Sequence, residues 1–468
     1  MKTELFRFIE RKISKYPDAN ICDTAGTVWS YKEFINKAVE FAEQLTYPKY
    51  GIFCRSELWS SLALMACFCA GVTAVPISVE YGEVQKKKII DTCGLSCILT
   101  DTKGYLSEEL VGQSIQEMEN LSDVALLMCT SGTTGIPRAA MLTERNILAN
   151  LLDIERYFPL AQKDRILISR SLCHAAVLTG EFLVALSKGA NIVFGGTRFD
   201  PAKMLILINE YDITVLCNTP TFFYHFCRFA PRHFVCSTLH MIAVSGECMT
   251  EKTASLICNT LPNVSVYHVY GLTEASPRVA WLPPEYFSKK PLSVGNTLAS
   301  VQIKIVDEKD SKTVLNTDSS SGVVGELWVS GPNIMKGYYN NREATNAVLQ
   351  DNWLKTGDLA YLDNDGHLVI CGRRDDLIIL AGLNIYPAEI ENRLLEEDAI
   401  AEILVQGRMG EEGVKLVFCV VPSDSQVTCE MIFSICRKKL PPQYWPHEIV
   451  LKQTLPKSVS GKTKRFSE

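Results

Sequence analysis

Residues 130–139 form a stretch rich in hydroxyl groups and glycine, directly after the apolar run at residues 124–129. A short apolar run of this kind predicts a buried strand, so the polar stretch is a loop at its end. Glycine lets the backbone approach a phosphate without a Cβ in the way, and successive N–H groups can point into one concavity. The candidate phosphate ligands are Thr130, Ser131, Gly132, Thr133, Thr134, Gly135 and Arg138. An ordinary Ser/Thr/Gly connecting loop is the alternative.

The composition of the chain narrows the classes of function. With 468 residues it is long enough for several domains, and 47% hydrophobic and 21% charged residues are typical of a globular enzyme. A net charge of −6 gives no basic footprint, so we expect no nucleic-acid partner. The first residues carry charges where a secretory leader needs an apolar stretch, which predicts a cytoplasmic protein.

An apolar stretch and a high cysteine count raise two further possibilities, a membrane span and a disulfide or zinc framework. The stretch at residues 62–77 is interrupted by Gly71 and Pro76 and is short for a span. We predict a helix over Leu62–Ala70 and a strand over Thr73–Ile77 instead, and no membrane span. The 17 cysteines contain no Cys-x-x-Cys pair. Without a leader, we expect reduced thiols and no zinc site.

Between residues 50 and 270, short apolar strands alternate with helical segments, a pattern typical of α/β proteins with parallel sheets covered on both faces. Thr143 and Thr250 are suited to cap two of the helices. The predicted strands are 50–54, 124–129, 165–169, 191–194, 213–217 and 240–245, and the predicted helices are 144–157, 176–187 and 250–259.

The pattern changes after residue 290, where short strands and Gly, Asp and Asn turns predict a β-rich subdomain at about 291–374. A compact α+β unit follows. Its predicted elements are strand 377–380, helix 387–396, strands 402–406 and 414–421, and helix 429–439. We therefore expect an N-terminal domain at residues 1–374 and a C-terminal domain at residues 375–468.

Several motifs occur in a fixed order along nearly the whole chain. After the loop at 130–139 come Tyr270-Gly271-Leu272-Thr273-Glu274, Lys355-Thr356-Gly357-Asp358, Gly372-Arg373-Arg374-Asp375-Asp376 and Pro456-Lys457-Ser458-Val459-Ser460-Gly461-Lys462-Thr463. Together they resemble the adenylate-forming, or acyl-activating, enzymes: acyl- and aryl-CoA synthetases, luciferases and peptide-synthetase adenylation domains. The resemblance implies a large N-terminal region of two helix-covered sheets plus a β subdomain, followed by a small mobile α+β C-terminal domain.

The resemblance also implies a nucleotide site. The 130–138 loop would wrap the β- and γ-phosphates of ATP, with Arg138 where the family usually has lysine. Thr273 would contact the α-phosphate and Glu274 would hold Mg²⁺, an ion that prefers oxygen ligands. The remaining implied contacts are Gly246, Glu247, Tyr270 and Gly271 around the adenine, and Asp358 and Arg373 at the ribose.

The resemblance also implies roles for three residues in and near the C-terminal domain. Lys462 would be the catalytic lysine, Asp375 the hinge and Gly382 a residue lining the entry of the thiol. Taken alone, the 456–463 segment would be a solvated tail. Its Gly461-Lys462-Thr463 also matches the end of a phosphate-binding P-loop, but Pro456 stands where that motif needs glycine, which excludes a P-loop NTPase.

The implied reaction has two steps: a small-molecule carboxylic acid and ATP give acyl-AMP and pyrophosphate, and a thiol then takes the acyl group. Ala175 stands where adenylation domains for α-amino acids carry Asp, so we do not expect an α-amino acid. The candidate acyl-pocket residues suggest an aryl or medium-chain acid. They are His174, Phe222, Phe223, Ala243 and Val269. A buried histidine satisfied by its neighbours is an equal alternative for His174.

The acceptor is either CoA or the phosphopantetheine of an acyl carrier protein. Ile379 and Ala381 stand where CoA ligases often carry lysine. Fewer positive charges are therefore available to bind the phosphates of CoA. A stand-alone adenylation domain that loads a carrier protein is therefore an alternative. An alternative of another class is a non-catalytic adenylate-binding scaffold that keeps the fold.

Overall fold

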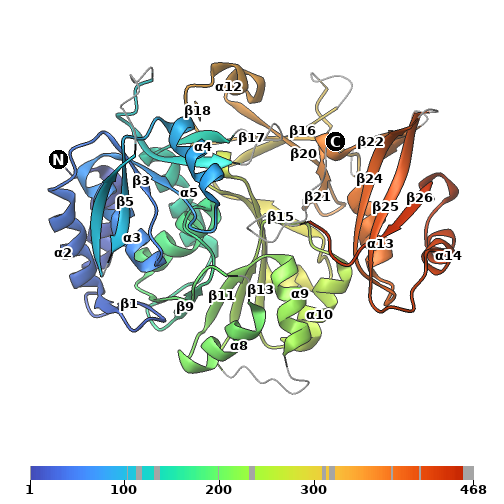
Figure 1. The fold of residues 1–468 in the computed structure, drawn as a ribbon, viewed down its shortest axis with the longest axis horizontal. Helices are drawn as coiled ribbons and strands as arrows, with labels where there is room; N and C mark the ends of the chain where they lie inside the picture. Colours follow the sequence, from blue (N-terminus) through green and yellow to red (C-terminus); the bar gives the residue numbers. More distant parts are fainter. Residues whose placement is uncertain are drawn as a thin grey trace.

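The computed structural model describes residues 2–102, 104–111, 119–130, 137–198, 200–230, 238–307, 313–315, 322–380, 383–410 and 413–456. Within this part of the chain, the strands form two large sheets and two small ones, and helices pack against both large sheets (Figure 1). No helix in the described segments has the length and apolarity that crossing a membrane requires.

The larger sheet has the strand order β16-β17-β20-β21-β15-β14-β13-β12-β11-β9-β10-β1-β2, with β19 beside β20. Its central strands, from β1 to β13, run parallel, as the strand–helix alternation predicted. The parallel strands and their edge strand are β1 (Asn20–Asp23), β2 (Val28–Ser30), β9 (Arg165–Ile168), β10 (Asn191–Phe194), β11 (Val215–Asn218), β12 (Met241–Val244) and β13 (Ser265–Gly271). The antiparallel part consists of β14 (Arg278–Leu282), β15 (Ser293–Thr297), β16 (Gln302–Val306), β17 (Gly325–Ser330), β19 (Leu349–Gln350), β20 (Trp353–Leu362) and β21 (Leu368–Arg373).

The second sheet has the order β18-β8-β7-β4-β3-β5-β6. Its strands are β3 (Lys49–Ile52), β4 (Thr73–Pro76), β5 (Cys97–Thr102), β6 (Tyr105–Leu110), β7 (Val124–Thr130), β8 (Arg138–Thr143) and β18 (Gly337–Tyr338). Strands β7 and β8 pair antiparallel and flank the predicted phosphate loop, with Thr130 opposite Arg138. The two ends of that loop are therefore fixed by a sheet.

The main hydrophobic core lies between the two large sheets and contains residues of both, together with the helices that separate them. Those helices are α1 (Glu4–Ile13), α2 (Tyr31–Ala42), α3 (Glu57–Ala70), α5 (Glu144–Tyr157) and the continuous segment α6 (Ala175–Val177), η1 (Leu178–Leu183) and α7 (Val184–Lys188). A second core lies beneath α8 (Pro201–Glu210), α9 (Pro220–Phe229) and α10 (Glu251–Thr260). Shorter or peripheral helices are α4 (Glu83–Cys93), η2 (Thr273–Ala275), α11 (Pro284–Phe287), α12 (Arg342–Val348) and η3 (Arg374–Asp376).

Local sequence signals predicted several elements closely. Helix α5 has the expected bounds, and Thr143 caps it: its side chain accepts a hydrogen bond from the Asn146 N–H. Thr250 caps α10 in the same way through the Thr253 N–H. The predicted helix at 176–187 is different, because its central turn is a π-helix rather than an α-helix.

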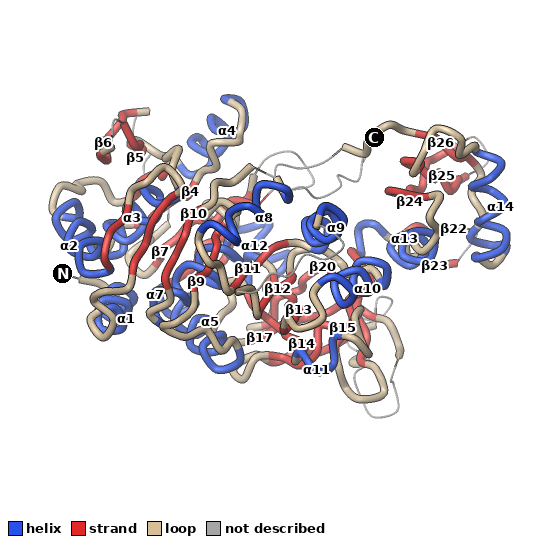
Figure 2. The backbone as a smooth tube through the Cα atoms, turned by 90° about the horizontal axis from the view of Figure 1, so that it is seen from below, coloured by secondary structure: helices blue, strands red, loops and turns tan. Residues whose placement is uncertain are grey.

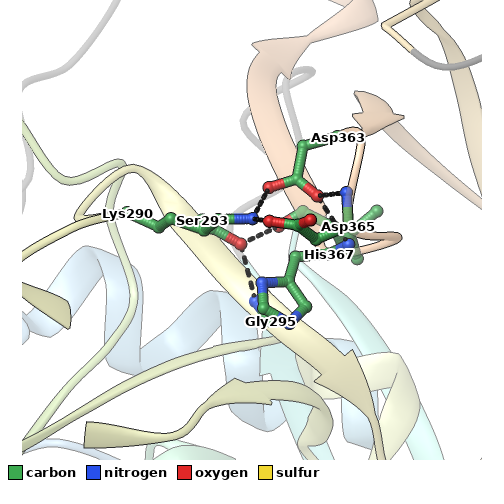
Figure 3. Close-up of polar contacts among 7 residues, drawn as sticks. Lys290, Ser293, Gly295, Asp363, Asp365 and His367 are labelled. Atoms are coloured by element: carbon green, nitrogen blue, oxygen red, sulfur yellow. Dashed lines mark hydrogen bonds and ion pairs between the residues drawn. The ribbon is translucent and has the colours of Figure 1, made fainter. Parts of the chain in front are cut away.

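A charged contact connects the segment before β15 with the turn between β20 and β21 (Figure 3). The ammonium of Lys290 contacts the carboxylates of Asp363, at 2.7 Å, and Asp365. Asp363 also accepts the backbone N–H of His367 at 2.9 Å, and the Ser293 hydroxyl donates to the Leu368 carbonyl at 2.9 Å. These contacts hold the β20–β21 turn, whereas the pairing of the two strands places Asp358 opposite Arg373.

The C-terminal unit stands apart at one end of the molecule in both views (Figures 1 and 2). It has its own core, made of residues between Ile378 and Leu440. Its elements are β22 (Ile378–Leu380), β23 (Leu383–Ile385), α13 (Pro387–Leu395), β24 (Ile400–Gly410), β25 (Gly413–Pro422), α14 (Cys429–Lys439), η4 (Pro442–Tyr444) and β26 (Glu448–Leu451). The large N-terminal region with a separate small domain is the predicted fold class.

Candidate active site

Tyr270, Asp358 and Arg373 meet at the end of β13, although 88 residues separate Tyr270 from Asp358 in the sequence. One carboxylate oxygen of the buried Asp358 accepts from Arg373 Nη1 at 3.0 Å, and the other accepts from the Tyr270 hydroxyl. Arg373 Nη1 also donates to the Thr356 carbonyl at 2.9 Å. Burial, reinforced by the Asp358 carboxylate, holds the pKa of Tyr270 well above its usual value. The tyrosine is therefore a neutral donor with a fixed ring.

The Asp358 carboxylate has capacity left for a ligand. Two carboxylate oxygens offer about four acceptor sites, and the protein contacts above use only part of them. The Thr356 hydroxyl donates to the Leu327 carbonyl at 2.7 Å and accepts the Asp358 N–H at 3.0 Å, which fixes the turn that carries the carboxylate. Such a rigid acidic group is suited to accept hydrogen bonds from a pair of neighbouring hydroxyls.

Glu274 lies on the short helix η2 and is connected to the phosphate loop through Tyr338. The Tyr338 hydroxyl donates to Glu274 Oε1 at 2.8 Å, and the Arg138 guanidinium carbon lies 5.7 Å from the centre of the Tyr338 ring. Strand β18 places Tyr338 opposite Ala140 of β8, beside the loop. Burial, with the Glu274 carboxylate, raises the pKa of Tyr338. The predicted triphosphate and metal residues Arg138 and Glu274 thus converge on one aromatic side chain.

The interior of the phosphate loop lies outside the described residues. The predicted ligands Ser131, Gly132, Thr133, Thr134 and Gly135 all fall there. The ends of the loop are described: the Thr130 hydroxyl donates to the Arg138 carbonyl at 3.4 Å. Lys462 and Gly382 also fall outside the described residues.

Gly271 has a steric reason to be glycine. A Cβ at this position would lie 2.1 Å from the Pro277 carbonyl oxygen, so any larger residue would displace the 271–277 turn. The Leu272 N–H donates to the same carbonyl at 2.9 Å. The glycine thereby holds Tyr270 and Thr273 on the two sides of a tight turn.

Gly246 and Glu247 follow β12 at the carboxyl edge of the sheet. Gly246 has a φ of 95°, in the region that favours glycine. Glu247 Oε2 accepts the Thr221 N–H at 3.1 Å and the Thr221 hydroxyl at 2.7 Å. Its other oxygen is enclosed and has no hydrogen-bond partner in the described part of the chain. This acceptor faces the edge at which parallel α/β sheets bind ligands.

The structure separates four of the five predicted acyl-pocket residues into two groups. Ala243 and Val269 belong to the core between the sheets. Phe222 and Phe223 belong to the core beneath α9, together with Ile242 and Val244. Because neighbouring strand residues point to opposite faces, the two phenylalanines and Ala243 lie on opposite sides of the sheet. The structure therefore does not bring these four candidate residues together on one face of the sheet.

His174 lies at the start of α6, on the side of the sheet that carries Ala243. It is half-buried, and its backbone carbonyl accepts the Val177 and Leu178 N–H groups at 2.9 and 3.0 Å. The preceding loop is held by Glu57, whose Oε2 accepts the Leu172 N–H at 3.0 Å. Asp375, the predicted hinge, is exposed in η3, between β21 and the C-terminal unit.

Sequence reasoning missed Tyr338 as a site residue, because the Gly337-Tyr338-Tyr339-Asn340 segment has the form of a structural turn. Nothing in its local pattern identifies a partner 64 residues away at Glu274. Its aromatic ring beside an arginine and its hydroxyl beside a carboxylate are visible only in the folded chain.

The donor set around Glu274 suits a magnesium ion that accompanies a phosphate ligand. No cluster of three or more His, Cys, Asp or Glu ligands occurs among the described residues. Mg²⁺ is commonly held by one or two carboxylates, with water and substrate phosphates completing the octahedron. Glu274, whose carboxylate has acceptor sites beyond its bond to Tyr338, fits that mode.

Comparison with known proteins agrees with this geometry. The family described as AMP-binding enzyme matches residues 9–339, and the AMP-binding enzyme C-terminal domain matches residues 389–462. The 2-succinylbenzoate–CoA ligase of Bacillus licheniformis is 30% identical over 437 residues, covering 86% of this chain and 85% of that protein. Feruloyl-CoA synthase of Amycolatopsis is 30% identical over 422 residues, covering 85% and 84%.

Solved structures give the same result. The o-succinylbenzoate CoA synthetase of Bacillus subtilis in complex with its acyl-adenylate intermediate has a TM-score of 0.84 at 26% identity, covering 97% of this chain and 96% of that chain. The same synthetase in complex with ATP and magnesium ion has a TM-score of 0.83, covering 97% and 98%. Since the family match spans most of the sequence and includes both domains, this chain belongs to the adenylate-forming family of AMP-binding enzymes.

Proposed function

We propose that this enzyme activates a carboxylic acid with ATP, releasing pyrophosphate, and transfers the resulting acyl group from acyl-AMP to the thiol of CoA. The convergence of Arg138, Tyr338 and Glu274 carries this proposal. Arg138 would supply a cation, and Glu274 an oxygen ligand for a metal, beside the ends of a hydroxyl- and glycine-rich loop. Asp358 and Arg373 offer the matching ribose contact from the neighbouring strands.

Each of the proposed nucleotide-binding residues suits a different part of ATP. Tyr270 presents an aromatic face fixed by its hydroxyl bond to Asp358, which suits a stacked adenine. Asp358 would accept from ribose hydroxyls, while Arg373 donates to its carboxylate and orients it. The loop residues and Arg138 bind the outer phosphates.

The first step is attack of the substrate carboxylate on the α-phosphorus. Negative charge then accumulates on the α-phosphoryl oxygens and on the departing pyrophosphate. Thr273 and Arg138, with Lys462, would stabilise that charge, which is where preorganised donors contribute most. Magnesium bound at Glu274 would neutralise phosphate charge.

The second step requires a rearrangement of the C-terminal domain. Lys462 and the thiol would approach the same reaction centre, so we infer that residues 375–468 turn about Asp375 between the two steps. An exposed residue in a short turn between two separately packed cores is suited to that movement. Gly382 would then line the thiol's path.

The assignment to CoA, rather than to a carrier protein, rests on relatives whose names are CoA ligases for aryl and long-chain acids. We assign the acyl pocket to the face that carries His174, Ala243 and Val269. Ala175 in place of an acidic residue argues against an α-amino acid.

The test is ATP–pyrophosphate exchange with purified enzyme and a panel of aryl, medium-chain and α-amino acids. Exchange that depends on an aryl or medium-chain acid, followed by CoA thioester formation, is the expected result. Thioester formation with phosphopantetheinyl carrier protein but not with CoA would instead assign the carrier-protein function. Nucleotide binding without exchange for any acid would indicate a scaffold and overturn the proposal.

A further inference from the structure

A buried ion pair lies in the helical segment that follows His174. Arg170 Nη2 donates to Glu181 Oε1 at 2.5 Å, and the Glu181 side chain is fully enclosed. Glu181 lies on η1, the π-helical turn at residues 178–183. Single π-turns within helices occur frequently at functional sites, because the extra residue re-aims side chains.

Arg278 places a second guanidinium against the same turn. A Cβ added to Gly180 would lie 2.8 Å from Arg278 Nη2, so glycine is needed for the guanidinium to reach the helix. The backbone of Arg278 is clamped by Asn150, which accepts its N–H at 3.0 Å and donates to its carbonyl at 2.8 Å. Arg278 is only 3% exposed. The surrounding fold therefore fixes the position of Arg278.

The polar groups of this cluster are incompletely paired. Arg170 Nε, Arg278 Nε and Glu181 Oε2 are all enclosed, and none has a hydrogen-bond partner in the described residues. Buried polar atoms are nearly always paired, because an unpaired one costs about 1–3 kcal/mol. Three such atoms in one cluster indicate a group that binds there.

The charge of the cluster determines the sign of the charge on the group that it would bind. Both guanidiniums are permanently protonated, and Glu181 supplies at most one negative charge. Tyr157 neighbours Arg278, and burial raises its pKa to about 12, so its hydroxyl is neutral near pH 7. The cluster therefore keeps a net positive charge whether or not Glu181 is ionised, and an anion complements it.

The cluster lies on the acyl side of the sheet. Cys217 of β11 pairs in register with Ala243, a proposed pocket residue. Glu181, Arg278 and Arg170 all influence the pKa of the Cys217 thiol, although its burial is the larger cause of the raised value. Arg278 is also the register partner of Gly271, beside Tyr270. Arg278 thus reaches the π-turn from strand β14, and Arg170 reaches it from the segment between β9 and α6.

We propose that Arg278 and Arg170 form a subsite for a second carboxylate on the acid substrate, so that the enzyme activates a dicarboxylic acid through its other carboxyl group. This inference rests on the proposed function and names its substrate class. Arg278 supplies the direct contact, and Glu181 orients Arg170. The same positive field disfavours a substrate ammonium group, in agreement with the exclusion of α-amino acids.

The experiment compares acids that differ by one carboxylate in ATP–pyrophosphate exchange. The pairs are butanoate and succinate, hexanoate and adipate, octanoate and suberate, and 3-phenylpropanoate and its ring-carboxylated analogue. We expect the best pair to favour the diacid by at least about tenfold in kcat/KM, because a buried charge pair contributes that much or more to recognition. This comparison uses the unmodified enzyme, so it does not depend on a variant that folds.

Arg278→Met provides the second arm. It should reduce the diacid-to-monoacid ratio of kcat/KM by about tenfold or more, while monoacid exchange persists. Arg278→Lys should restore part of the ratio. Arg228→Met, which removes an exposed arginine from α9, is the matched control and should leave the ratio unchanged. A merely structural role would lower both rates together and leave the ratio intact.

The outcomes separate the two proposals. Monoacid exchange with no diacid preference in any pair would overturn the dicarboxylate inference and leave the proposed function standing. An unchanged ratio in Arg278→Met would remove Arg278 from the subsite. Failure of every acid to support exchange would overturn the proposed function itself.

Discussion

The nucleotide side and the proposed acyl side of this enzyme both contain buried polar groups. The two sides differ in whether the protein itself supplies hydrogen-bond partners for these groups. Around Asp358, both carboxylate oxygens are engaged by protein donors, Tyr270 and Arg373. Around Glu181, one oxygen and the Nε atoms of two arginines are enclosed without partners. The first network holds its own geometry. On our proposal, the second becomes fully hydrogen-bonded when a substrate carboxylate binds to it.

This difference matches the tasks of the two sides. Every reaction of an adenylate-forming enzyme uses the same nucleotide, so its contacts can be preorganised within the protein. The acid differs among relatives, which are named for succinylbenzoate, ferulate and long-chain fatty acids. Specificity for the acid therefore depends on groups that are satisfied by the substrate itself.

The largest expected effect lies outside both networks. Lys462→Ala should reduce acid-dependent ATP–pyrophosphate exchange by about 10²–10³-fold, because it removes one preorganised donor from the developing charge. Lys452→Ala, at an exposed lysine in the same C-terminal domain, is the control and should retain full activity. Undiminished exchange in the Lys462 variant would remove this residue from the mechanism.

Asp358→Asn tests the self-contained network. The amide keeps the shape but leaves Arg373 without its anionic partner, and a hydrogen bond to a charged group contributes about 1.5–3 kcal/mol. We expect kcat/KM for ATP to fall by about 10–100-fold, with little change in the preference among acids. Asp365→Asn, at a mostly exposed aspartate paired with Lys290, should leave ATP kinetics unchanged. A change in acid preference would mean that the two sides are coupled.

Asp375→Pro separates the two chemical steps. Proline fixes φ and removes an N–H, so the turn should lose its freedom to pivot. Adenylation should persist while CoA thioester formation slows by about tenfold, measured by exchange and by thioester assay on the same preparation. Asp375→Ala should behave like the parent enzyme. Equal loss of both steps in the proline variant would argue against a pivot at this residue.

Tyr338→Phe tests the link between the phosphate loop and Glu274. The variant keeps the ring beside Arg138 and loses only the hydroxyl that donates to Glu274. A hydrogen bond contributes about 1 kcal/mol, so the magnesium concentration for half-maximal exchange should rise by about fivefold. The neighbouring Tyr339→Phe loses a bond from Lys49 instead and should not shift the magnesium dependence. An unchanged magnesium requirement in Tyr338→Phe would show that the Tyr338 hydroxyl does not contribute to the metal site.

We expect the smallest effect on activity at Glu57, on the acyl side, where the measured quantity is the stability of the enzyme. Burial is the main cause that raises the pKa of Glu57 to about 7 from an ordinary 4.5, so the folded chain binds more protons there than the unfolded chain in this window. Stability should therefore fall as pH rises from about 4.5 to about 7, by on the order of 3 kcal/mol.

Glu57→Gln should flatten that dependence. The measurement is urea unfolding at pH 5 and pH 8, with the exposed Glu343→Gln on α12 as control. A parent-like decline in the Glu57 variant would show that another group causes it.

The sequence by itself determined the local elements and the family. Helix α5 and strand β10 have their predicted bounds, and the caps at Thr143 and Thr250 are made as expected, because periodicity and capping act within a few residues. The order of the motifs identified the adenylate-forming enzymes, and it predicted the residues of the nucleotide site.

Only the tertiary structure decided which residues meet. It joined Tyr338 to Glu274, placed Phe222 on the opposite side of the sheet from Ala243, and brought Arg170, Glu181 and Arg278 into one buried cluster. The physical reason is that burial on one face of a strand, and pairing across the 64 residues between Glu274 and Tyr338, depend on packing between distant elements. Local patterns of hydrophobicity do not record which distant element supplies the partner.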